Sequence, residues 1–277
     1  MPDTRSATPD TGVRSLADDV RHRTDPQLAR LLMLRQDLAR PAPTDLTALA
    51  ARAGTRASVQ RAVDTLDLAH LHVLEAALAD AGPVDASTVA TLLGADQTAV
   101  AAVLDHLWDL ALLWRSPEGL RVTRTAGEVL PQPAGLGPAG GDRAAEAATR
   151  VEDELADAPP AARAIVERMT WGPPYATLPA GTPDRVTDGA RWLLERHLVS
   201  APAADQLVLP REVAMALRGG RTHRQPALVA PELDGSPREL SVVDAAAGQQ
   251  VTDLLALVDE LAAEWGLRPP RVLRDRS

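Results

Sequence analysis

Apolar residues recur every three or four positions along most of this chain, and short alternating runs interrupt that spacing in two places. The longer spacing puts leucine, valine and alanine on one face of a helix, whereas alternation is typical of a half-buried strand. Proline and glycine stand where the apolar stretches end, notably at Pro41, Gly54 and Gly94. The pattern predicts a mainly α fold with small β-hairpins.

Residues 14–66 are expected to form a helical N-terminal segment after a disordered lead-in at residues 1–13. The spacing predicts one helix over 24–40. Two shorter helices should follow, the first capped by Asp45 and ended by Gly54 in the left-handed conformation. A short helix, a glycine turn and a second helix are typical of a helix-turn-helix unit.

Polar side chains fall at this turn and along the second helix of the pair, where a recognition helix would meet DNA. The candidate DNA contacts are Arg52, Arg56, Gln60 and Arg61. The alternative is an ordinary helical hairpin with a solvated polar face, since Ala-rich hairpins are common.

Residues 67–131 predict a winged helix, which is three helices followed by a β-hairpin. Two short apolar runs flank a turn sequence at 116–119 that contains Pro and Gly. The third helix would take the recognition position, yet it carries Asp96, Asp105 and Asp109 and no Arg. Phosphate would repel such a helix, so we expect this unit to serve packing or protein contact.

Residues 132–158 are expected to be a linker and an amphipathic helix. The linker contains the spacing G-x-G-x-x-G at Gly135, Gly137 and Gly140. A dinucleotide site needs this spacing between a strand and a helix of a βαβ unit, but here a Pro-rich stretch precedes it and Pro138 interrupts it. We therefore assign no cofactor.

Residues 159–224 repeat the apolar pattern of the first unit and predict a second winged helix. LLERHLVS at 193–200 follows the pattern of LWDLALLW at 107–114. LVLPREVAMAL then matches LRVTRTAGEVL once one residue is inserted in the hairpin, which aligns Arg211 with Arg124.

Arginine distinguishes the second unit from the first. Its long helix and the basic run after its last helix supply further candidate DNA contacts, which are Arg185, Arg191, Arg218, Arg221 and Arg224. The alternative is that these are surface arginines, some of them paired with Asp184, Asp188 and Glu195.

Residues 225–277 are expected to be a connector and a C-terminal helix whose apolar stripe runs from Val251 to Trp265. No apolar run approaches the roughly 20 residues that cross a bilayer, and residues 1–13 hold no apolar segment that could act as a secretory signal. The absence of cysteine excludes disulfides and Cys-based zinc sites and suits a cytoplasmic protein. We expect no membrane partner.

Composition and charge narrow the functional classes. Phe is absent and aromatic residues make up 2%, so Ala, Leu and Val must fill the cores. All 29 basic residues are Arg, and the absence of Lys excludes a phosphate-loop ATPase. The net charge of −9 counts against a generic DNA-coating protein, and residues 69–141 hold three Arg against eight acids.

The sequence shows no catalytic or metal-binding constellation. His70 and His72 are two positions apart on a helix and so point to different faces, which is poor metal geometry. A His-Glu-x-x-His motif and a nucleophile elbow are both missing. We assign no catalytic residue and no metal, and an enzyme with an unrecognised Asp and Arg site is a weaker alternative.

Several stretches together resemble one protein family. They are LTALAARAGTRASVQRAVDTLD, PAGLGP, WGPP, RWLLERHLV, LPREVAMALRGGR and WGLRPPRVLR. The chain resembles, over roughly residues 14–273, the helicase-associated, XPB-like helicase C-terminal-domain proteins of high-GC bacteria. Members are usually longer, so the resemblance implies that this chain is the N-terminal portion. It also implies winged-helix modules and association with DNA or a DNA helicase, and it carries no catalytic residue.

Taken together, these patterns predict tandem winged-helix modules between N- and C-terminal helices. The leading functional hypothesis is a non-enzymatic DNA-binding or helicase-associated protein. The alternative is a protein–protein interaction scaffold whose winged helices do not bind DNA. The oligomeric state is left open by the sequence.

Overall fold

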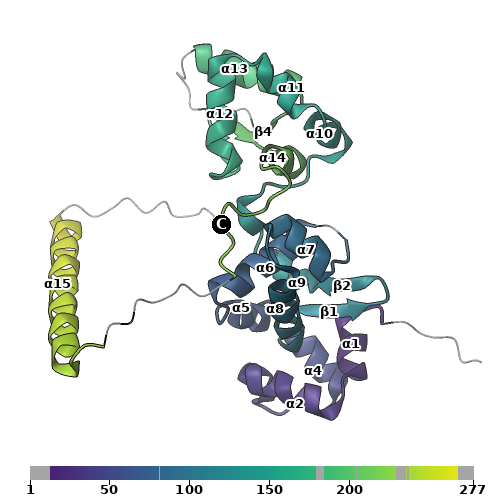
Figure 1. Ribbon diagram of the computed structural model, residues 1–277, viewed down its shortest axis with the longest axis vertical. Coiled ribbons are helices and arrows are strands. Elements are labelled where there is room, and N and C mark those ends of the chain that lie inside the picture. Colours follow the sequence, from purple (N-terminus) through teal and green to yellow (C-terminus); the bar gives the residue numbers. More distant parts are fainter. Residues whose placement is uncertain are drawn as a thin grey trace, which may run out of the picture. The chain divides into compact units, whose positions relative to one another are not determined.

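The computed structural model describes residues 13–80, 82–178, 184–203, 205–228, 235 and 237–267. Helices dominate this part of the chain and strands are confined to short antiparallel sheets, which confirms the expected mainly α class (Figure 1). The chain divides into two compact units, residues 1–229 and 230–277. The described residues of the first unit contain three clusters of buried hydrophobic side chains.

Short helices build the N-terminal cluster. They are α1 (Leu16–His22), α2 (Asp25–Leu34), α3 (Gln36–Ala39) and α4 (Leu46–Ala53). The single helix predicted over 24–40 is wrong, because the backbone leaves the helical region at Arg35 with φ −121° and ψ 80°. The break lets the buried Arg35 guanidinium reach the carbonyl oxygens of Ala53 and Leu110. Hydrogen bonds to residues distant in the sequence therefore outweigh the local preference for a continuous helix at Arg35.

The ends of α4 were only partly predicted. The carboxylate of Asp45 accepts the backbone N–H of Ala48 at 2.7 Å, which confirms it as the N-cap. Gly54 is not left-handed, because its φ of −85° and ψ of −2° continue the right-handed turn. The chain thus enters α5 (Arg56–Val63) without the sharp reversal that a left-handed glycine would give.

The predicted helix-turn-helix pair does not form as one packed unit. Leu49 and Ala53 of α4 are buried in the N-terminal cluster. Val59 and Val63 of α5 are instead buried in the second cluster. The two helices of the predicted pair are therefore buried in different clusters, and the helix-turn-helix assignment stays a prediction. The spacing of apolar residues predicted both helices, but it did not predict the hydrophobic cluster in which each is buried.

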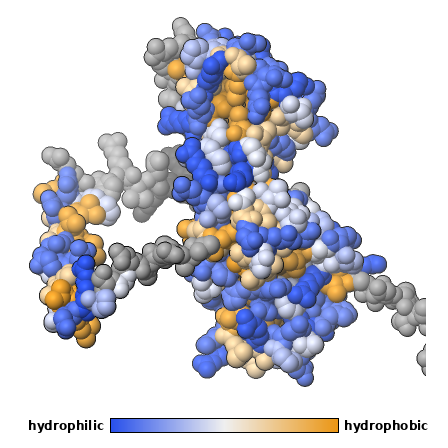
Figure 2. All heavy atoms as spheres, viewed as in Figure 1, coloured by the Kyte–Doolittle hydropathy of each residue, from blue (hydrophilic) through white to orange (hydrophobic). Residues whose placement is uncertain are grey.

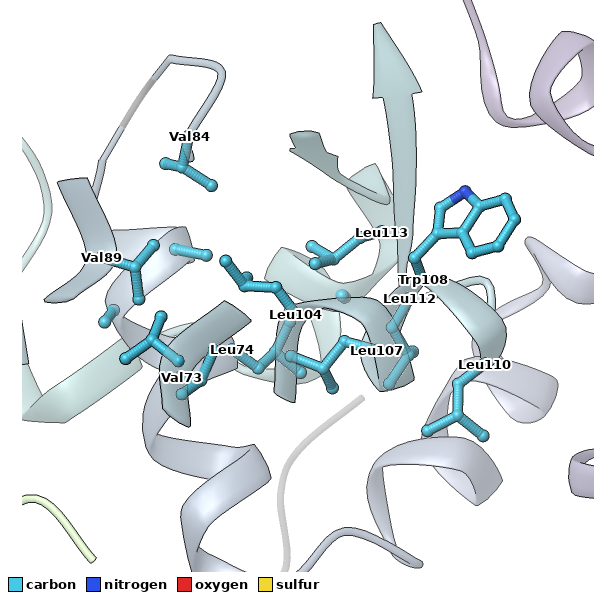
Figure 3. Close-up of a cluster of buried hydrophobic side chains, with 14 of the residues drawn as sticks. Val73, Leu74, Val84, Val89, Leu104, Leu107, Trp108, Leu110, Leu112 and Leu113 are labelled. Carbon is cyan, nitrogen blue, oxygen red and sulfur yellow. The ribbon is translucent and has the colours of Figure 1, made fainter. Parts of the chain in front are cut away.

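The second cluster lies among α5 and the elements that follow it. These are α6 (Leu68–Ala79), α7 (Ala86–Leu93), α8 (Gln97–Asp109), β1 (Leu113–Ser116), β2 (Gly119–Val122) and α9 (Arg124–Val129). The predicted hairpin is confirmed, with Leu113 opposite Val122 and Ser116 opposite Gly119. Val84 adds a bridge to Leu120 on the far side of β2. Figure 3 shows leucines and valines of α6, α7, α8 and β1 packed together, with Trp108 at the edge of the cluster.

Trp108 joins α1 to this second cluster. Its indole Nε1 donates to the buried Asp19 carboxylate at 2.9 Å, and the same carboxylate accepts the Arg23 Nε–H at 3.0 Å. The guanidinium groups of Arg23 and Arg115 lie 4.2 and 4.1 Å from the indole centroid. Each polar group of this contact is therefore paired, as burial requires.

The third cluster lies among the remaining elements of the first unit. They are η1 (Pro133–Gly135), α10 (Gly141–Ala148), α11 (Val151–Ala156), α12 (Pro160–Thr170), β3 (Tyr175–Thr177), α13 (Asp184–Glu195), β4 (Ser200–Ala203), β5 (Gln206–Val208) and α14 (Arg211–Leu217). The predicted hairpin of β4 and β5 is confirmed, and β3 adds a third antiparallel strand that the sequence did not reveal. The strand order is β3-β5-β4.

The predicted linker at 131–141 is packed rather than free. Leu136 is fully buried in the third cluster. Gly137 lies so close to β5 that an added Cβ would sit 2.4 Å from the Leu209 carbonyl oxygen. The amphipathic helix that follows is broken into α10 and α11, and both pack with 159–217. Residues 132–158 therefore belong to the second repeat.

A backbone feature supports the alignment of the two repeats. Ala111 and His197 occupy equivalent positions in LWDLALLW and LLERHLVS, and both are left-handed, with φ of 56° and 57°. After each residue, a leucine N–H bonds back to a leucine carbonyl, from Leu112 to Leu107 at 3.1 Å and from Leu198 to Leu193 at 3.0 Å. This is the Schellman ending, which turns the chain from a helix into a hairpin.

The second compact unit consists, where it is described, of α15 (Leu240–Leu267) and flanking residues. Helix α15 matches the expected C-terminal helix, and none of its residues is buried. The predicted connector begins too early, because Leu228 packs on the second cluster. No single helix of the described chain has the length and apolar content to span a membrane, although α7 and α8, bent by 116°, pass that test as a pair.

The left-handed residue at the second joint makes a testable prediction. His197 is exposed and keeps φ at 57°, which a side chain with a Cβ resists. His197→Gly should therefore raise the free energy of unfolding, by up to about 1 kcal/mol. Urea denaturation followed by circular dichroism measures the change.

The control is Ala164→Gly, an exposed position inside α12 with ordinary helical geometry. It should lower the free energy of unfolding by about 0.5–1 kcal/mol. A loss of stability in both variants would contradict the proposed strain at His197.

Candidate nucleic-acid interface

Arg218 was predicted to contact nucleic acid, but it lies inside the protein. It is the C-cap of α14 and only 6% exposed. Its guanidinium donates to the carbonyl oxygens of Thr170 at 2.5 Å, Ala134 at 2.9 Å and Thr222 at 3.1 Å. The prediction for Arg218 is wrong, because its donors satisfy carbonyl groups on three segments of the chain.

Burial lowers the pKa of Arg218 to about 10, which still leaves it a cation at neutral pH. The guanidinium carbon lies 4.7 Å from the centroid of Trp171, whose ring face favours a positive charge. Arg218 is thus held by carbonyl dipoles and an aromatic face, and removing it would leave several carbonyl groups without these donors.

Arg52 and Arg221 are also used within the protein. Arg52 is half-buried and donates to the carbonyl oxygens of Leu38 at 3.1 Å and Pro41 at 2.5 Å, which ties α4 to α3 and to the chain just after it. Arg221 is half-buried over the left-handed Gly94 at the end of α7. A Cβ on Gly94 would lie 1.6 Å from Arg221 Nη1. Neither side chain is freely displayed for a phosphate.

Two of the predicted contacts are exposed but already paired. Gln60 donates to the Asp64 carboxylate at 2.8 Å. Arg191 pairs with Asp188 at 2.7 Å, and both side chains are 64% exposed. Such surface pairs are worth about 0–1 kcal/mol, so they could open for a ligand. The side chain of Arg185 lies outside the described residues.

The remaining candidates are Arg56, Arg61 and Arg224. All three are exposed, and neither Arg56 nor Arg61 forms a hydrogen bond or ion pair with any described residue. Gln60 and Asp64 lie between the two α5 arginines on the same outward face. Arg224 lies 5.3 Å from the Trp171 centroid and lines a cavity of about 370 Å³ together with Arg163 and Glu167.

Helices α8 and α13 are the two that the sequence predicts for the recognition position. On α8, the exposed stripe includes Thr98, Ala102 and Asp105, and Asp105 is 71% exposed and bonded to Arg115 at 3.3 Å. On α13, the exposed positions are Asp188, Arg191 and Glu195. Among described side chains, therefore, neither helix presents an arginine that lacks a carboxylate partner.

A cluster of histidines and one carboxylate was missed by the sequence reasoning. His72 and Glu75 share one face of α6, and His223 stacks on His72 with ring centroids 4.0 Å apart. The His223 Nε2 lies 3.0 Å from a Glu75 carboxylate oxygen, and the ligand atoms of all three residues lie within 4.8 Å of one another. The spacing of His72 and Glu75 was readable, but nothing local places His223 beside them.

The hydrogen bonds of this cluster argue against a metal site. The backbone N–H of Ala227 donates to His72 Nδ1 at 3.2 Å, so a neutral His72 must carry its proton on Nε2. A metal-binding histidine needs a free lone pair on the coordinating nitrogen and a proton on the other. The arrangement instead fastens residues 222–227 onto α6, which is a structural role.

Comparisons with known proteins add no family to this geometry. No protein-family model matches the chain, and neither does any curated protein or solved structure. The family resemblance drawn from the sequence motifs therefore stays a prediction. The observations that bear on function are the positions and pairing of the described side chains.

Two histidines make stability depend on pH. Burial lowers the pKa of His72 first, and the adjacent His223 lowers it further. Burial followed by the nearby His70 also lowers the pKa of His106. Because the unfolded chain, with pKa values near 6.5, binds these protons more readily, the free energy of unfolding should decrease as pH falls through 6.5.

Urea denaturation at pH 7.5 and pH 5.5 tests this prediction, above the range where carboxylates titrate. His72→Gln, which cannot titrate, should retain its fold at pH 7.5 and lose less stability than the parent protein on acidification. An equal loss in both proteins would show that His72 does not contribute to the pH dependence.

Proposed function

We propose that this chain is a non-enzymatic binding protein with two winged-helix modules, and that these modules contact another protein rather than DNA. The order of elements supports the modules. In the first, α6, the Val84 bridge, α7 and α8 precede the β1–β2 hairpin. In the second, α12, β3 and α13 precede the β4–β5 hairpin (Figure 1).

The choice of a protein partner over DNA rests on the charged side chains of α8 and α13, the helices expected in the recognition position. DNA affinity depends on arginines and lysines that neutralise phosphates. Helix α8 carries no arginine, and its exposed Asp105 is paired with Arg115, whereas Asp109 is mostly buried and paired with Arg30. The exposed Arg191 of α13 is paired with Asp188. Among the described side chains, a phosphate backbone would therefore meet no arginine on α8 and, on α13, an arginine that must first leave its pair with Asp188.

An apolar cavity beside α8 suits a protein partner. It measures about 350 Å³ and is lined by Val84, Leu104 and Leu120, with Asp105 and Arg115 also on its wall. A buried apolar anchor surrounded by charged groups is the usual composition of a protein contact. The sequence resemblance implies association with DNA or a DNA helicase, and of these a helicase is the protein partner that we propose for this cavity.

Reversing the charge at Asp105 tests the proposal. Asp105→Arg changes an exposed side chain whose Arg115 pair contributes little to stability. When the full chain is purified with its partner from the source cells, the Asp105→Arg variant should retain at least tenfold less bound partner protein than the parent protein. Quantitative mass spectrometry of the purified complex measures the loss.

The matched control is Asp157→Arg, the same charge change at an exposed position after α11. It should retain the partner at the parent level. Equal retention in both variants would contradict a contact at α8, and equal loss would indicate a general effect of charge.

A second candidate function is DNA contact through α5. Arg56 and Arg61 are exposed on one face of that helix, and no described residue pairs with them.

If this face of α5 binds duplex DNA, fluorescence anisotropy should detect binding at low salt. The slope of log affinity against log salt concentration should fall by about two in the double variant Arg56→Ala, Arg61→Ala. Arg124→Ala, with an exposed arginine paired to Glu128, serves as the control. An absence of binding at low salt would remove this candidate and favour the protein partner.

A further inference from the structure

Helix α15 carries an apolar surface that its own unit does not cover. It is 28 residues long, and none of them is buried. Its large apolar side chains, from Leu240 to Leu267, are between 45% and 85% exposed. Figure 2 shows these hydrophobic residues along the length of the helix. An apolar surface of this extent marks an interaction site.

The apolar side chains follow a seven-residue repeat. Val251, Leu254, Val258, Leu261 and Trp265 are separated by three, four, three and four residues, and Ala247 extends the series towards the N-terminus. This is the a/d spacing of a coiled coil, in which each seam residue inserts between residues of a facing helix. Asp244 would be the next seam residue, so the seam begins at Ala247.

The identity of the seam residues favours two parallel strands. Val251 and Val258 stand at position a, and Leu254 and Leu261 stand at position d. A β-branched residue at a with leucine at d is the combination that stabilises parallel dimers. The chain supplies an identical seam in every copy, so a second copy is the partner that fits without further assumption.

The charges of α15 leave this seam open to a second copy. The helix holds five acids and no arginine. Asp253, Asp259 and Glu260 fall at positions b and c, which face outward in a two-stranded coiled coil. Asp244 precedes the seam, and Glu264 at position g is the one acid beside it. Leu255 and Leu257 flank the seam instead of charged residues and widen the apolar contact. Like charges therefore do not meet across the seam of a parallel pair.

The available area is sufficient for a stable pair. Seven large apolar side chains lie on the seam or beside it, and burying a leucine or valine removes roughly 60–120 Å² from water. Two copies would then bury on the order of 1,000–1,500 Å² of apolar surface, which reaches the range of specific interfaces.

We propose that the chain forms a dimer through α15, as a parallel two-stranded coiled coil over residues 247–265 with a second copy. This proposal is independent of the partner suggested for α8. It predicts that the full chain has twice the mass of 29.3 kDa at micromolar concentration. Sedimentation equilibrium measures that mass.

A pair of substitutions tests the seam. Leu254→Asp with Val258→Asp places two carboxylates per helix inside the interface, and the dissociation constant should rise at least a hundredfold. Ala256→Asp introduces the same side chain at position f, on the outward face, and should leave the dimer intact. A monomeric parent protein, or a double variant as dimeric as the parent, would overturn the proposal.

A cross-link tests the parallel orientation and separates seam contact from helix loss. The chain contains no cysteine, so Val258→Cys introduces one thiol per copy. In a parallel dimer, the two thiols face each other at the same seam position, and mild oxidation should join them into a covalent dimer. Ala256→Cys should not cross-link comparably. A dimer without the Val258→Cys cross-link, or a tetramer, would overturn the parallel pair.

Discussion

Three buried arginines hold the parts of the first compact unit together by donating to backbone carbonyl groups. Arg23 donates to the Trp108 carbonyl at 2.6 Å, near the end of α8, and Arg35 donates to the Leu110 carbonyl at 3.1 Å. Arg218 donates to the Thr170 carbonyl, which ends α12. The last carbonyl groups of a helix lack partners within the helix, and these arginine side chains supply donors to them. Arginine suits this task because its planar guanidinium offers five donors in a fixed fork.

The same arrangement explains why a chain with few aromatic residues can assemble several small cores. With 2% aromatics, each cluster is packed mainly by Leu, Val and Ala, and Trp108 is the aromatic side chain that links the second cluster to α1. Arg23 and Arg35 link the N-terminal cluster to the end of α8, and Arg218 links α14 to α12. Burial lowers the pKa of each of these groups, yet guanidinium keeps its charge at neutral pH. Arginines that bond to buried carbonyl groups are not available on the surface. Counting arginines in the sequence therefore overestimated the number that could contact nucleic acid.

Features set by nearby residues could be predicted, and those set by distant residues could not. The cap at Asp45 and the helix end at Gly94 depend on a few neighbours and were predicted correctly, although the left-handed conformation expected at Gly54 does not form. The break at Arg35 depends on carbonyl groups 18 and 75 positions away, which no local pattern reveals. The same reason hid the burial of Arg218 and the meeting of His72 with His223. For the candidate site, the sequence showed that α8 has no arginine, but it did not show the pairing of Asp105 with Arg115 or of Asp109 with Arg30.

The two repeats share their internal positions and differ on their surfaces. Leu112 and Leu198 are fully buried after the left-handed Ala111 and His197, so both the packing and the backbone reversal are kept. The exposed faces diverge, because α8 carries Asp105 where the corresponding helix, α13, carries Arg191 beside Asp188. A helix-to-hairpin joint has few physical solutions, since the chain must reverse and the final carbonyl groups must be satisfied. Solvent-facing positions have no such constraint. The two repeats can therefore share a backbone arrangement and still present different side chains on their surfaces.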